Sequence, residues 1–418
     1  MDPGYPALHI RPASGWVNDP NGLCRVDGTW HVFFQHNPAA GVHGDICWGH
    51  VSSTDLLRWQ EHPVALRPRP GGPDAAGCWS GCVVEDAGTP VAVYTAMPGD
   101  PAEATVATAR SDRTLVRWGR RAAPLGAAAA GPGQVRDPFV FRYAGRRYAV
   151  QGAGDRGGRP SLLVHECTDL ARWVARGTLL DDADPWVATL AAAEIWECPN
   201  LVQVDGRWVL VVSLWRSSPT RDVLAGSRWF LGDLEEHPGG LRFQPVAGGV
   251  LDSGPAWYAP QLLPDRERTL VWGWAMETAR TEEECRRSGW AGALTFPREL
   301  RVREDRVVMV PAAELTGLRA GAVADPGGGP LGLPAFEVVA TGAVRLELDG
   351  RTVVEVHGSP QDPARVLVDG GVVEAFAAGD AHTTRARPGA DHGWTVGAAP
   401  GTTTVHRLAL PAAGAGPC

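Results

Sequence analysis

Three acidic residues stand in short segments whose composition suits catalysis. They are Asp19 in GWVNDPNG, Asp137 in VRDP and Glu197 in IWECPN. A proline follows each acid within two residues. Because proline fixes φ and lacks an amide proton, we expect these acids at strand ends or bends. Directed into one funnel, three such acids could divide the cleavage of a glycosidic bond. One would attack the anomeric carbon, one would protonate the leaving oxygen and one would hold sugar hydroxyls.

The segments that must position these acids have the pattern of β-strands. Short runs rich in valine and aromatic residues, bounded by Gly, Pro, Asp or Asn, predict strands at 29–35, 91–95, 147–151, 208–214 and 270–274. Asp-Gly or Ala-Gly pairs between such runs predict two-residue hairpin turns at 27–28, 144–145 and 205–206. Segment 278–287 is the best candidate for a helix, but its TEEEC run favours a solvated charged turn.

A repeated phrase indicates a repeated unit. Residues 55–59 and 169–173 share the pattern D-L-x-x-W. Five four-stranded units of about 60 residues would fill the first 300 residues, as the blades of a propeller do. Pro-Gly-rich sequence at 325–334 predicts a linker, and the alternating runs beyond it predict a small sandwich. We therefore expect an all-β protein with a five-bladed β-propeller catalytic domain over 1–305 and a small C-terminal β-sandwich over 306–418.

Charge and composition exclude several classes of function. The net charge is −8 and the pI about 5.9, which gives no electrostatic attraction to nucleic acid or to an anionic membrane. All 39 basic residues are arginine. Schiff-base chemistry and a P-loop phosphate site both need a lysine, so neither is expected. No run approaches about 18 consecutive apolar residues, the length that predicts a membrane-spanning helix.

The metal-binding residue types are scattered. The eight cysteines include no CxxC pair, and the histidines between 31 and 62 form no H-x-x-x-H helix pattern. We therefore expect no metal and no cofactor. The N-terminus lacks the basic start and apolar stretch of a signal peptide, which predicts a cytoplasmic protein with free thiols. The sequence gives no indication of oligomeric state.

Beyond the three acids, the chain closely resembles glycoside hydrolase family 32, which contains invertases, inulinases, levanases and sucrose-6-phosphate hydrolases. The family motifs W-M-N-D-P-N-G, R-D-P and E-C match residues 16–22, 136–138 and 197–198 in the same order. Further resemblance extends over most of the chain, at 30–38, 48–56, 79–83, 258–261, 294–300, 368–369 and 373–376. The resemblance implies a five-bladed propeller followed by a β-sandwich, which looks short here for the family.

The resemblance also implies roles for individual residues. Asp19 is expected to be the nucleophile, Glu197 the general acid/base and Asp137 the transition-state stabiliser. The expected substrate-binding residues are Asn18, Gln35, Trp48, Trp79, Ser80 and Arg136, and Arg136 is also expected to orient or charge-balance the acidic cluster. Val17, Trp79, Cys82 and Asn200 depart from the usual family residues, and of these Trp79 and Asn200 could reshape the pocket. The substrate expected from these features is a small carbohydrate, sucrose or a short fructan.

Other activities fit parts of the same pattern. A fructosyltransferase would use the same site, with a sugar hydroxyl replacing water in the second step. An inverting, arabinanase-like propeller also carries three acids but lacks the W-x-N-D-P-N-G and E-C motifs. A non-catalytic sugar-binding propeller predicts a lost carboxylate, and here all three are present. Sucrose, sucrose 6-phosphate, inulin and levan all stay open as substrates.

Overall fold

The computed structural model describes residues 2–126, 133–155, 157–220, 222–323, 329–399 and 401–412. Strands account for most of these residues and helical elements for few of them, which confirms the expectation of an all-β protein. The helical elements among them are short: α1 (Pro185–Leu190), α2 (Glu282–Ser288), and the 3-10 turns η1 (Pro101–Glu103) and η2 (Ala313–Leu318). In this part of the chain, no helix is both long enough and apolar enough to cross a membrane.

Five antiparallel sheets follow one another along the chain up to Pro311. Sheet I contains β1 (Gly15–Val26), β2 (Thr29–Asn37), β3 (Cys47–Ser53), β4 (Gln60–Leu66) and the added parallel strand β19 (Trp290–Ala291). Sheet II contains β5 (Gly77–Asp86), β6 (Thr89–Met97), β7 (Thr105–Ser111) and β8 (Trp118–Ala122). Sheet III contains β9 (Gly133–Tyr143), β10 (Arg146–Asp155), β11 (Pro160–Asp169) and β12 (Arg172–Asp181).

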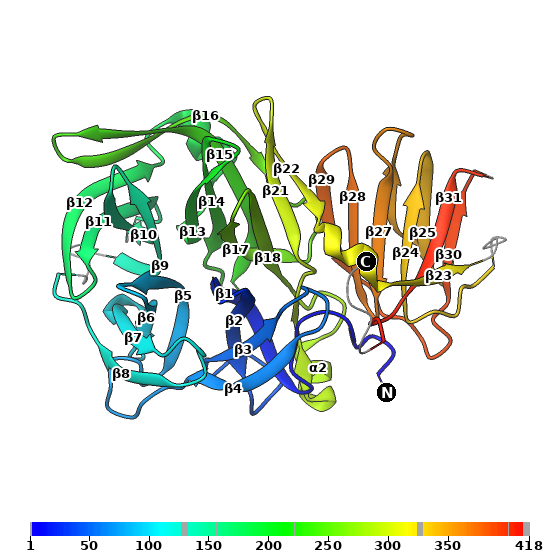
Figure 1. The fold of residues 1–418 in the computed structure, drawn as a ribbon, viewed down its shortest axis with the longest axis horizontal. Helices are drawn as coiled ribbons and strands as arrows, with labels where there is room; N and C mark the ends of the chain where they lie inside the picture. The colour runs from blue at the N-terminus through cyan, green and yellow to red at the C-terminus, as the bar shows by residue number, and fades with distance from the viewer. Residues whose placement is uncertain are drawn as a thin grey trace.

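Sheet IV contains β13 (Ile195–Val204), β14 (Arg207–Arg216), β15 (Val223–His237) and β16 (Gly240–Val250). Sheet V contains β17 (Trp257–Asp265), β18 (Arg268–Ala275), β20 (Ala293–Leu294), β21 (Arg298–Arg303) and β22 (Arg306–Pro311). The first strand of each sheet contacts the first strand of the next, and β17 returns to contact β1. The colours in Figure 1 accordingly run once around a circle, from blue through cyan and green to yellow. The first strands thus surround a common centre.

The predicted hairpin turns are confirmed. Asp27 and Gly28 have φ of 49° and 87°, the left-handed values that a two-residue turn between right-twisted strands requires. The pairs at 144–145 and 205–206 have the same signs of φ. The two D-L-x-x-W phrases also lie at equivalent places, since both join the third strand of a sheet to the fourth, in sheets I and III. Their leucines, Leu56 and Leu170, are buried.

The expectation of a charged turn at 278–287 is wrong, because the segment contains α2. Thr281 and Glu284 form a reciprocal capping box, in which each side chain accepts from the other's backbone amide. Gly289 ends the helix with φ of 74°. Only Cys285 of the helix is buried, so the local capping signal outweighed the missing apolar face.

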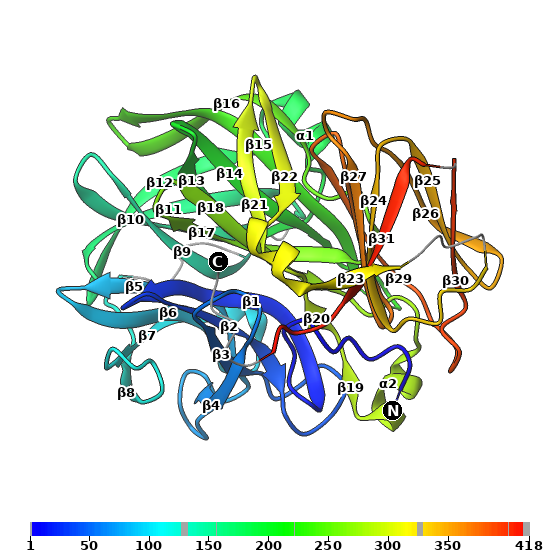
Figure 2. The ribbon, with the colours of Figure 1, turned by 45° about the vertical axis from the view of Figure 1, so that its right-hand side comes forward.

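Two further sheets make up the C-terminal part. Sheet VI contains six strands: β23 (Arg319–Val323), β24 (Ala335–Ala340), β27 (Ala364–Asp369), β28 (Val372–Ala377), β29 (Asp380–Arg385) and β31 (Thr403–Leu408). Sheet VII contains β25 (Ala343–Leu348), β26 (Arg351–His357) and β30 (Trp394–Ala398). One apolar cluster, with Phe336 and Trp394 fully buried in it, takes side chains from both sheets. Figure 2 shows the two sheets as adjacent layers.

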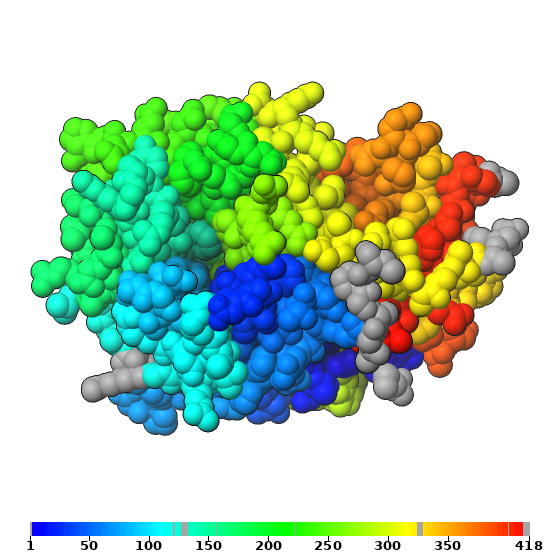
Figure 3. Space-filling model, in the orientation of Figure 1, coloured from blue at the N-terminus to red at the C-terminus, as the bar shows by residue number. Residues whose placement is uncertain are grey.

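The Pro-Gly-rich segment expected to be a linker is only partly described. Its residues 325–328 lie outside the described residues, and 329–334 have no regular secondary structure. The expected domain boundary at residue 305 falls within the hairpin between β21 and β22, so sheet V extends a few residues beyond it. In the space-filling view, orange atoms of the C-terminal part lie directly beside yellow atoms of the part that precedes it (Figure 3).

A buried ionic network joins this C-terminal part to sheet V. The Arg298 side chain is fully buried and donates to Glu374 Oε2 from Nε (2.8 Å) and Nη2 (2.6 Å). Its Nη1 donates to Asp252 Oδ2 at 2.8 Å. His9 lies between Asp369 (2.8 Å) and Glu374 (2.9 Å). Burial alone would lower the pKa of His9, but hydrogen bonds to these two carboxylates raise it. Charges from both parts of the chain therefore compensate one another in the interior.

Removing the central guanidinium should cost the most stability. We expect Arg298→Met to lower the free energy of unfolding by about 3–5 kcal/mol, because it leaves the carboxylates of Asp252 and Glu374 buried without their cation. Urea unfolding would measure the loss. The control is Arg306→Met, whose exposed pair with Asp380 should be worth less than about 1 kcal/mol. Equal effects of the two substitutions would contradict this role for the network.

Candidate active site

A cavity of about 390 Å³ opens at the centre of the five first strands. Each of these strands carries a pair of adjacent residues at an equivalent position, and every member of these pairs except Cys198 and Ala259 lines the cavity. The first members are Asn18, Trp79, Arg136, Glu197 and Tyr258, and the second members are Asp19, Ser80, Asp137, Cys198 and Ala259. Arg136, Glu197 and Tyr258 are spaced 61 residues apart, as are Asp19 and Ser80. The site is therefore assembled from equivalent positions of a repeated unit.

The backbone is irregular at these pairs. The ladder between first and second strand shifts register at this point in all five sheets. Asp137, Cys198 and Ala259 have φ of 59°, 46° and 47°, an uncommon conformation for residues other than glycine. A proline follows each of the three, as the sequence analysis expected for bends. Such bulges turn side chains out of the regular alternation, which here directs them into the cavity.

Close approach of sheets III and IV depends on Gly152. It pairs with Arg136 on the neighbouring strand. A Cβ at this position would lie 1.9 Å from the carbonyl oxygen of Trp196, well inside any allowed contact. The glycine thus lets β13 lie against β10, which brings Glu197 beside Arg136.

Three neutral N–H and O–H donors hold Asp19. Its Oδ1 accepts from Asn18 Nδ2 at 3.0 Å, and its Oδ2 accepts from Gln35 Nε2 at 3.1 Å and from Ser80 Oγ at 2.6 Å. Trp16 Nε1 donates to Asn18 Oδ1 at 2.7 Å, which fixes the amide so that its NH₂ faces the carboxylate. The donors orient Asp19 without neutralising it, and that arrangement suits a nucleophile.

Glu197 lies between a cation and a phenol. Arg136 Nε donates to its Oε1 at 2.9 Å, and Tyr258 OH donates to its Oε2 at 2.7 Å. Gln134 Oε1 accepts from Arg136 at 2.5 Å, and the guanidinium lies 5.4 Å from the ring centroid of Trp215. Arg136 is 4% exposed, so its fork is held in one orientation. These contacts fix the position of the Glu197 carboxyl at the edge of the cavity.

Asp137 is linked to the other acids through Cys198. The Cys198 amide donates to Asp137 Oδ2 at 3.0 Å. The thiol of Cys198 lies 3.5 Å from Asp19 Oδ2 and 3.6 Å from Asp137 Oδ2, so it bridges the two carboxylates. Burial and the nearby carboxylates raise the pKa of this thiol well above its usual value. Cys198 therefore stays a neutral S–H donor between two acids.

Besides burial, the charge of Glu197 contributes to raised pKa values at Asp19 and Asp137. Burial raises the pKa of Asp19, and the hydrogen bond from Ser80 opposes that rise. The pKa of Asp137 is raised to about 7, chiefly by burial and then by the charge of Glu197, while Arg136 acts in the opposite direction. One guanidinium thus faces three carboxyl groups, and the cluster is under electrostatic strain at neutral pH.

That strain predicts a pH-dependent stability. When a carboxyl group has a higher pKa in the folded protein than in the unfolded chain, the folded protein loses stability as the pH rises between the two values. For Asp137 this window runs from about pH 4 to about pH 7. We expect Asp137→Asn to flatten the fall of Tm across it and to stabilise the protein at pH 8. The gain is up to roughly 4 kcal/mol, since each pKa unit is worth about 1.4 kcal/mol.

Thermal melts of wild type, Asp137→Asn and the exposed control Asp380→Asn between pH 4 and pH 8 would measure the effect. Asp380→Asn should retain the wild-type slope because the side chain of Asp380 is 68% exposed. Parallel slopes for wild type and Asp137→Asn would show that Asp137 titrates normally.

Most residues expected to bind substrate do lie at the cavity. Its walls include Asn18, Gln35, Trp79, Ser80 and Arg136 together with the three acids. Trp48 was expected to bind substrate, but the structure does not place it at the cavity. Its side chain is fully buried, and it is absent from the described residues that line the cavity. It pairs with Gln35 across β2 and β3, but β5 covers it, and its Nε1 donates to the carbonyl of Trp79 at 3.0 Å. Trp48 therefore supports the wall from behind.

Asn200 also lies away from the cavity walls. Its side chain is 2% exposed and bonds to the neighbouring first strand β17, at Pro260 O (2.9 Å) and Leu262 N (3.0 Å). Asn21 and Gln261, each following a proline like Asn200, make similar bonds to Gly81 N and to Leu23 N. These side chains tie successive first strands together.

Several cavity residues had no assigned role in the sequence analysis. Besides Tyr258 they are Trp16, His43, Pro101, Gln134, Trp215, Asp222, Leu224 and Trp274. Tyr258 could have been found from its 61-residue offset from Glu197 in a Y-A-P segment. The others lie outside these residue pairs. Trp16 and Gln134 are on the first strands β1 and β9, two residues before Asn18 and Arg136, and the rest are on neighbouring strands or in the connections between strands. Among the described residues, no group of three or more His, Cys, Asp or Glu could hold a metal ion.

Comparison with known proteins identifies the family. Residues 9–311 match the sequence profile of the glycosyl hydrolases family 32 N-terminal domain. The chain belongs to glycosyl hydrolase family 32. Among family 32 relatives, a sucrose-6-phosphate hydrolase of Klebsiella pneumoniae is 34% identical over 330 residues, which cover 76% of this chain and 69% of that protein. A raffinose invertase of Escherichia coli is 31% identical over 331 residues, covering 75% and 66%.

Solved structures share the fold over nearly the whole chain. A sucrose-6-phosphate hydrolase of Lactobacillus gasseri superposes with a TM-score of 0.79 at 20% identity, covering 98% of this chain and 94% of that one. A family 32 β-fructofuranosidase of Bombyx mori gives a TM-score of 0.78 at 24% identity, covering 97% and 94%. The C-terminal sheets are thus part of the shared fold.

Proposed function

We propose that this family 32 chain is a retaining β-fructofuranosidase. It releases terminal β-D-fructofuranosyl residues from sucrose or short fructans. The observation that carries the proposal is the gathering of Asp19, Asp137 and Glu197 in one cavity, with Glu197 held by Arg136 and Tyr258. The names of the relatives support it, as does the Bombyx mori enzyme, which has been solved in complex with sucrose.

In the first step, the Asp19 carboxylate attacks the anomeric carbon of fructose. The bond to the leaving oxygen breaks, and Glu197 gives its proton to that oxygen. Water then enters; Glu197 takes a proton from it, and the hydroxide attacks the anomeric carbon and releases Asp19. Asp137 accepts hydrogen bonds from fructose hydroxyls, with Asn18, Gln35 and Ser80 orienting the nucleophile. The indoles of Trp79 and Trp215 offer apolar surface to the sugar rings.

We also propose an assignment of the fold. Sheets I to V are the blades of a five-bladed β-propeller, and sheets VI and VII form a C-terminal β-sandwich. The circle of contacts among first strands supports the propeller, and the apolar cluster common to sheets VI and VII supports the sandwich. The division falls after β22, near residue 312, because that strand pairs with β21.

Two assays test the function. The first measures fructose released from sucrose, sucrose 6-phosphate, inulin and levan. We expect release from sucrose at least, and no release from any of the four would overturn the proposal. The second analyses products at high sucrose concentration. Fructose as the main product supports hydrolysis, whereas oligosaccharides as the main product would assign a fructosyltransferase.

A further inference from the structure

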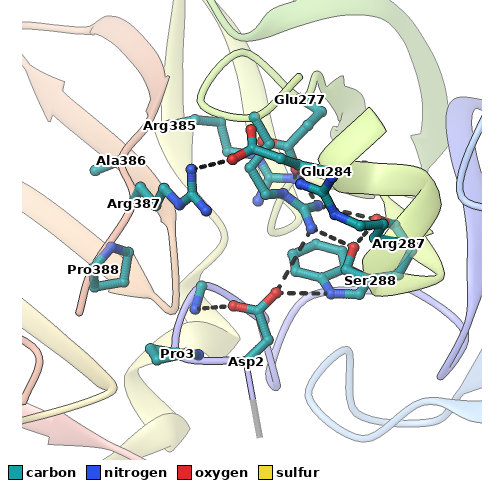
Figure 4. Close-up of a pocket in the computed structure, with 13 residues that line it drawn as sticks. Asp2, Pro3, Glu277, Glu284, Arg287, Ser288, Arg385, Ala386, Arg387 and Pro388 are labelled. Atoms are coloured by element: carbon teal, nitrogen blue, oxygen red, sulfur yellow. Dashed lines mark hydrogen bonds and ion pairs between the residues drawn. The ribbon is translucent and has the colours of Figure 1, made fainter. Parts of the chain in front are cut away.

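A second cavity, of about 420 Å³, lies where the N-terminal segment, α2 and the chain after β29 meet. Figure 4 shows Arg387 and Pro388 on one side of it, Ser288 on the other and Asp2 below. The charged residues that line it are Asp2, Glu277, Arg280, Glu284, Arg287, Arg385 and Arg387. None of them belongs to the catalytic cavity.

Guanidinium groups crowd around one indole at the wall of this cavity. Arg280, Arg11 and Arg385 lie 3.7, 4.5 and 5.9 Å from the ring centroid of Trp290. Arg280 and Arg385 share the carboxylate of Glu277, at 2.6 and 3.2 Å, and Arg280 also reaches Asp2 Oδ2 at 3.7 Å. Arg287 and Arg387 also line the cavity, which makes four arginines against three carboxylates, those of Asp2, Glu277 and Glu284. Arg11, beside Trp290, and Glu283, which pairs with Arg287, add one charge of each sign, so the excess is one positive charge.

The guanidinium groups of Arg11, Arg280 and Arg385 repel one another in a largely buried environment. Burial lowers the pKa of Arg11 to about 10, and the charges of Arg385 and Arg280 contribute to that lowering. Burial likewise lowers the pKa of Arg385, with Arg280 acting in the same direction against the attraction of Glu277. One nitrogen of Arg11, Nη2, is buried without a hydrogen-bond partner. An anion in the cavity would relieve this repulsion.

Two arginines are available to such an anion. The side chain of Arg387 is 62% exposed and uses Nη1 to reach Glu284 at 2.6 Å. The side chain of Arg287 is 66% exposed and uses Nη1 to reach Glu283 at 3.3 Å. Guanidinium forks match the geometry of phosphate oxygens and are less strongly hydrated than ammonium groups. Asp2 and Glu284 could accept hydrogen bonds from hydroxyl groups beside the anion.

We propose that this cavity binds the phosphoryl group of a small sugar phosphate. Its volume is within the range of small-molecule sites. The excess of guanidinium favours an anion over a neutral sugar, and the carboxylates at its border favour a ligand that also carries hydroxyls. The site is separate from the catalytic cavity and is independent of which fructoside the enzyme cleaves.

Isothermal titration of the full chain with glucose 6-phosphate, inorganic phosphate and glucose tests the proposal. Because binding is read as heat and not as hydrolysis, a loss of activity would leave the result interpretable. We expect saturable binding of glucose 6-phosphate, weaker binding of inorganic phosphate, and no binding of glucose. The double variant Arg287→Ala/Arg387→Ala should bind glucose 6-phosphate at least tenfold more weakly than wild type.

The matched control is Arg345→Ala, which removes an arginine 51% exposed and paired with Glu355 on the C-terminal sheets. It should bind glucose 6-phosphate as wild type does. An absence of saturable binding to wild type would overturn the proposal. So would equal affinity in the double variant, because the ligand would then lie elsewhere. Glucose binding as tightly as its phosphate would replace the anion site with a neutral sugar site.

Discussion

Asp19→Ala is expected to lower kcat on sucrose by roughly 10⁴-fold or more. Loss of a covalent nucleophile removes the intermediate through which the reaction proceeds, and such losses in other enzymes reach this size. At 25 °C a factor of 10⁴ corresponds to about 5.5 kcal/mol of activation free energy. The substitution leaves Asn18, Gln35 and Ser80 without their common acceptor, but it also removes a carboxyl whose pKa burial raises. The two effects on stability oppose each other, so we expect a folded protein.

The measurement is initial rates of fructose release from purified protein, with a thermal melt of the same sample. Asp380→Ala serves as a matched control, since it removes an exposed aspartate on the C-terminal sheets and should keep wild-type kcat. Retention of more than roughly a tenth of wild-type kcat in a folded Asp19→Ala variant would show that Asp19 is not the nucleophile, because even general acid–base catalysis alone contributes about 10²–10⁴-fold.

The repeated architecture could be predicted because the repeat leaves local marks. Two-residue turns between β-runs and the D-L-x-x-W phrases both recur at equivalent hairpins, and the structure places them so. Sheet V is less regular, because α2, β19 and β20 intervene between β18 and β21. That insertion carries no repeat signal, and its helix depends on a capping box that the charged composition obscured.

Side-chain direction at the site could be predicted less well. A strand pattern says which residues alternate, but not which neighbouring sheet covers them. Trp48 and Gln35 are cross-strand partners, yet β5 buries Trp48 while Gln35 reaches the cavity. The bulges add a second obstacle, because a register shift changes the face on which each following residue lies. Only the prolines at 20, 138, 199 and 260 marked these positions in the sequence.

The acids themselves were predictable as a set, whereas their coupling was not. Cys198 bridges Asp19 and Asp137 only because it occupies the position in sheet IV that those aspartates occupy in sheets I and III. Arg136 was expected to bind substrate and to orient or charge-balance the acidic cluster, and its guanidinium is found on Glu197. Its guanidinium, on sheet III, compensates the negative charge of Glu197 on sheet IV. Contacts between neighbouring sheets depend on how the five sheets are arranged around the cavity, and no local sequence pattern predicts that arrangement.

Glu197→Ala is expected to reduce kcat on sucrose by about 10²–10⁴-fold, the usual contribution of a general acid–base group. The loss should be much smaller for an aryl fructoside with a good leaving group, because that oxygen departs without a proton. Added azide should then accelerate turnover of the aryl substrate, since it needs no base to attack the fructosyl–Asp19 intermediate. Asp19→Ala should show neither effect. A loss equally large on both substrates, unrescued by azide, would contradict the acid/base role.

The configuration of the azide product decides between two geometries. If the carboxyl groups of Asp19 and Glu197 lie about 5–5.5 Å apart, two displacements occur and the fructosyl azide keeps the β configuration of the substrate. If they lie about 6.5–9.5 Å apart, water fits beside the base, and a single displacement inverts the configuration at the anomeric carbon. Three donors fix Asp19, and Arg136 and Tyr258 fix Glu197, so neither carboxyl can swing to bridge a longer gap. We therefore expect the β-azide by NMR; the α-azide would assign an inverting enzyme.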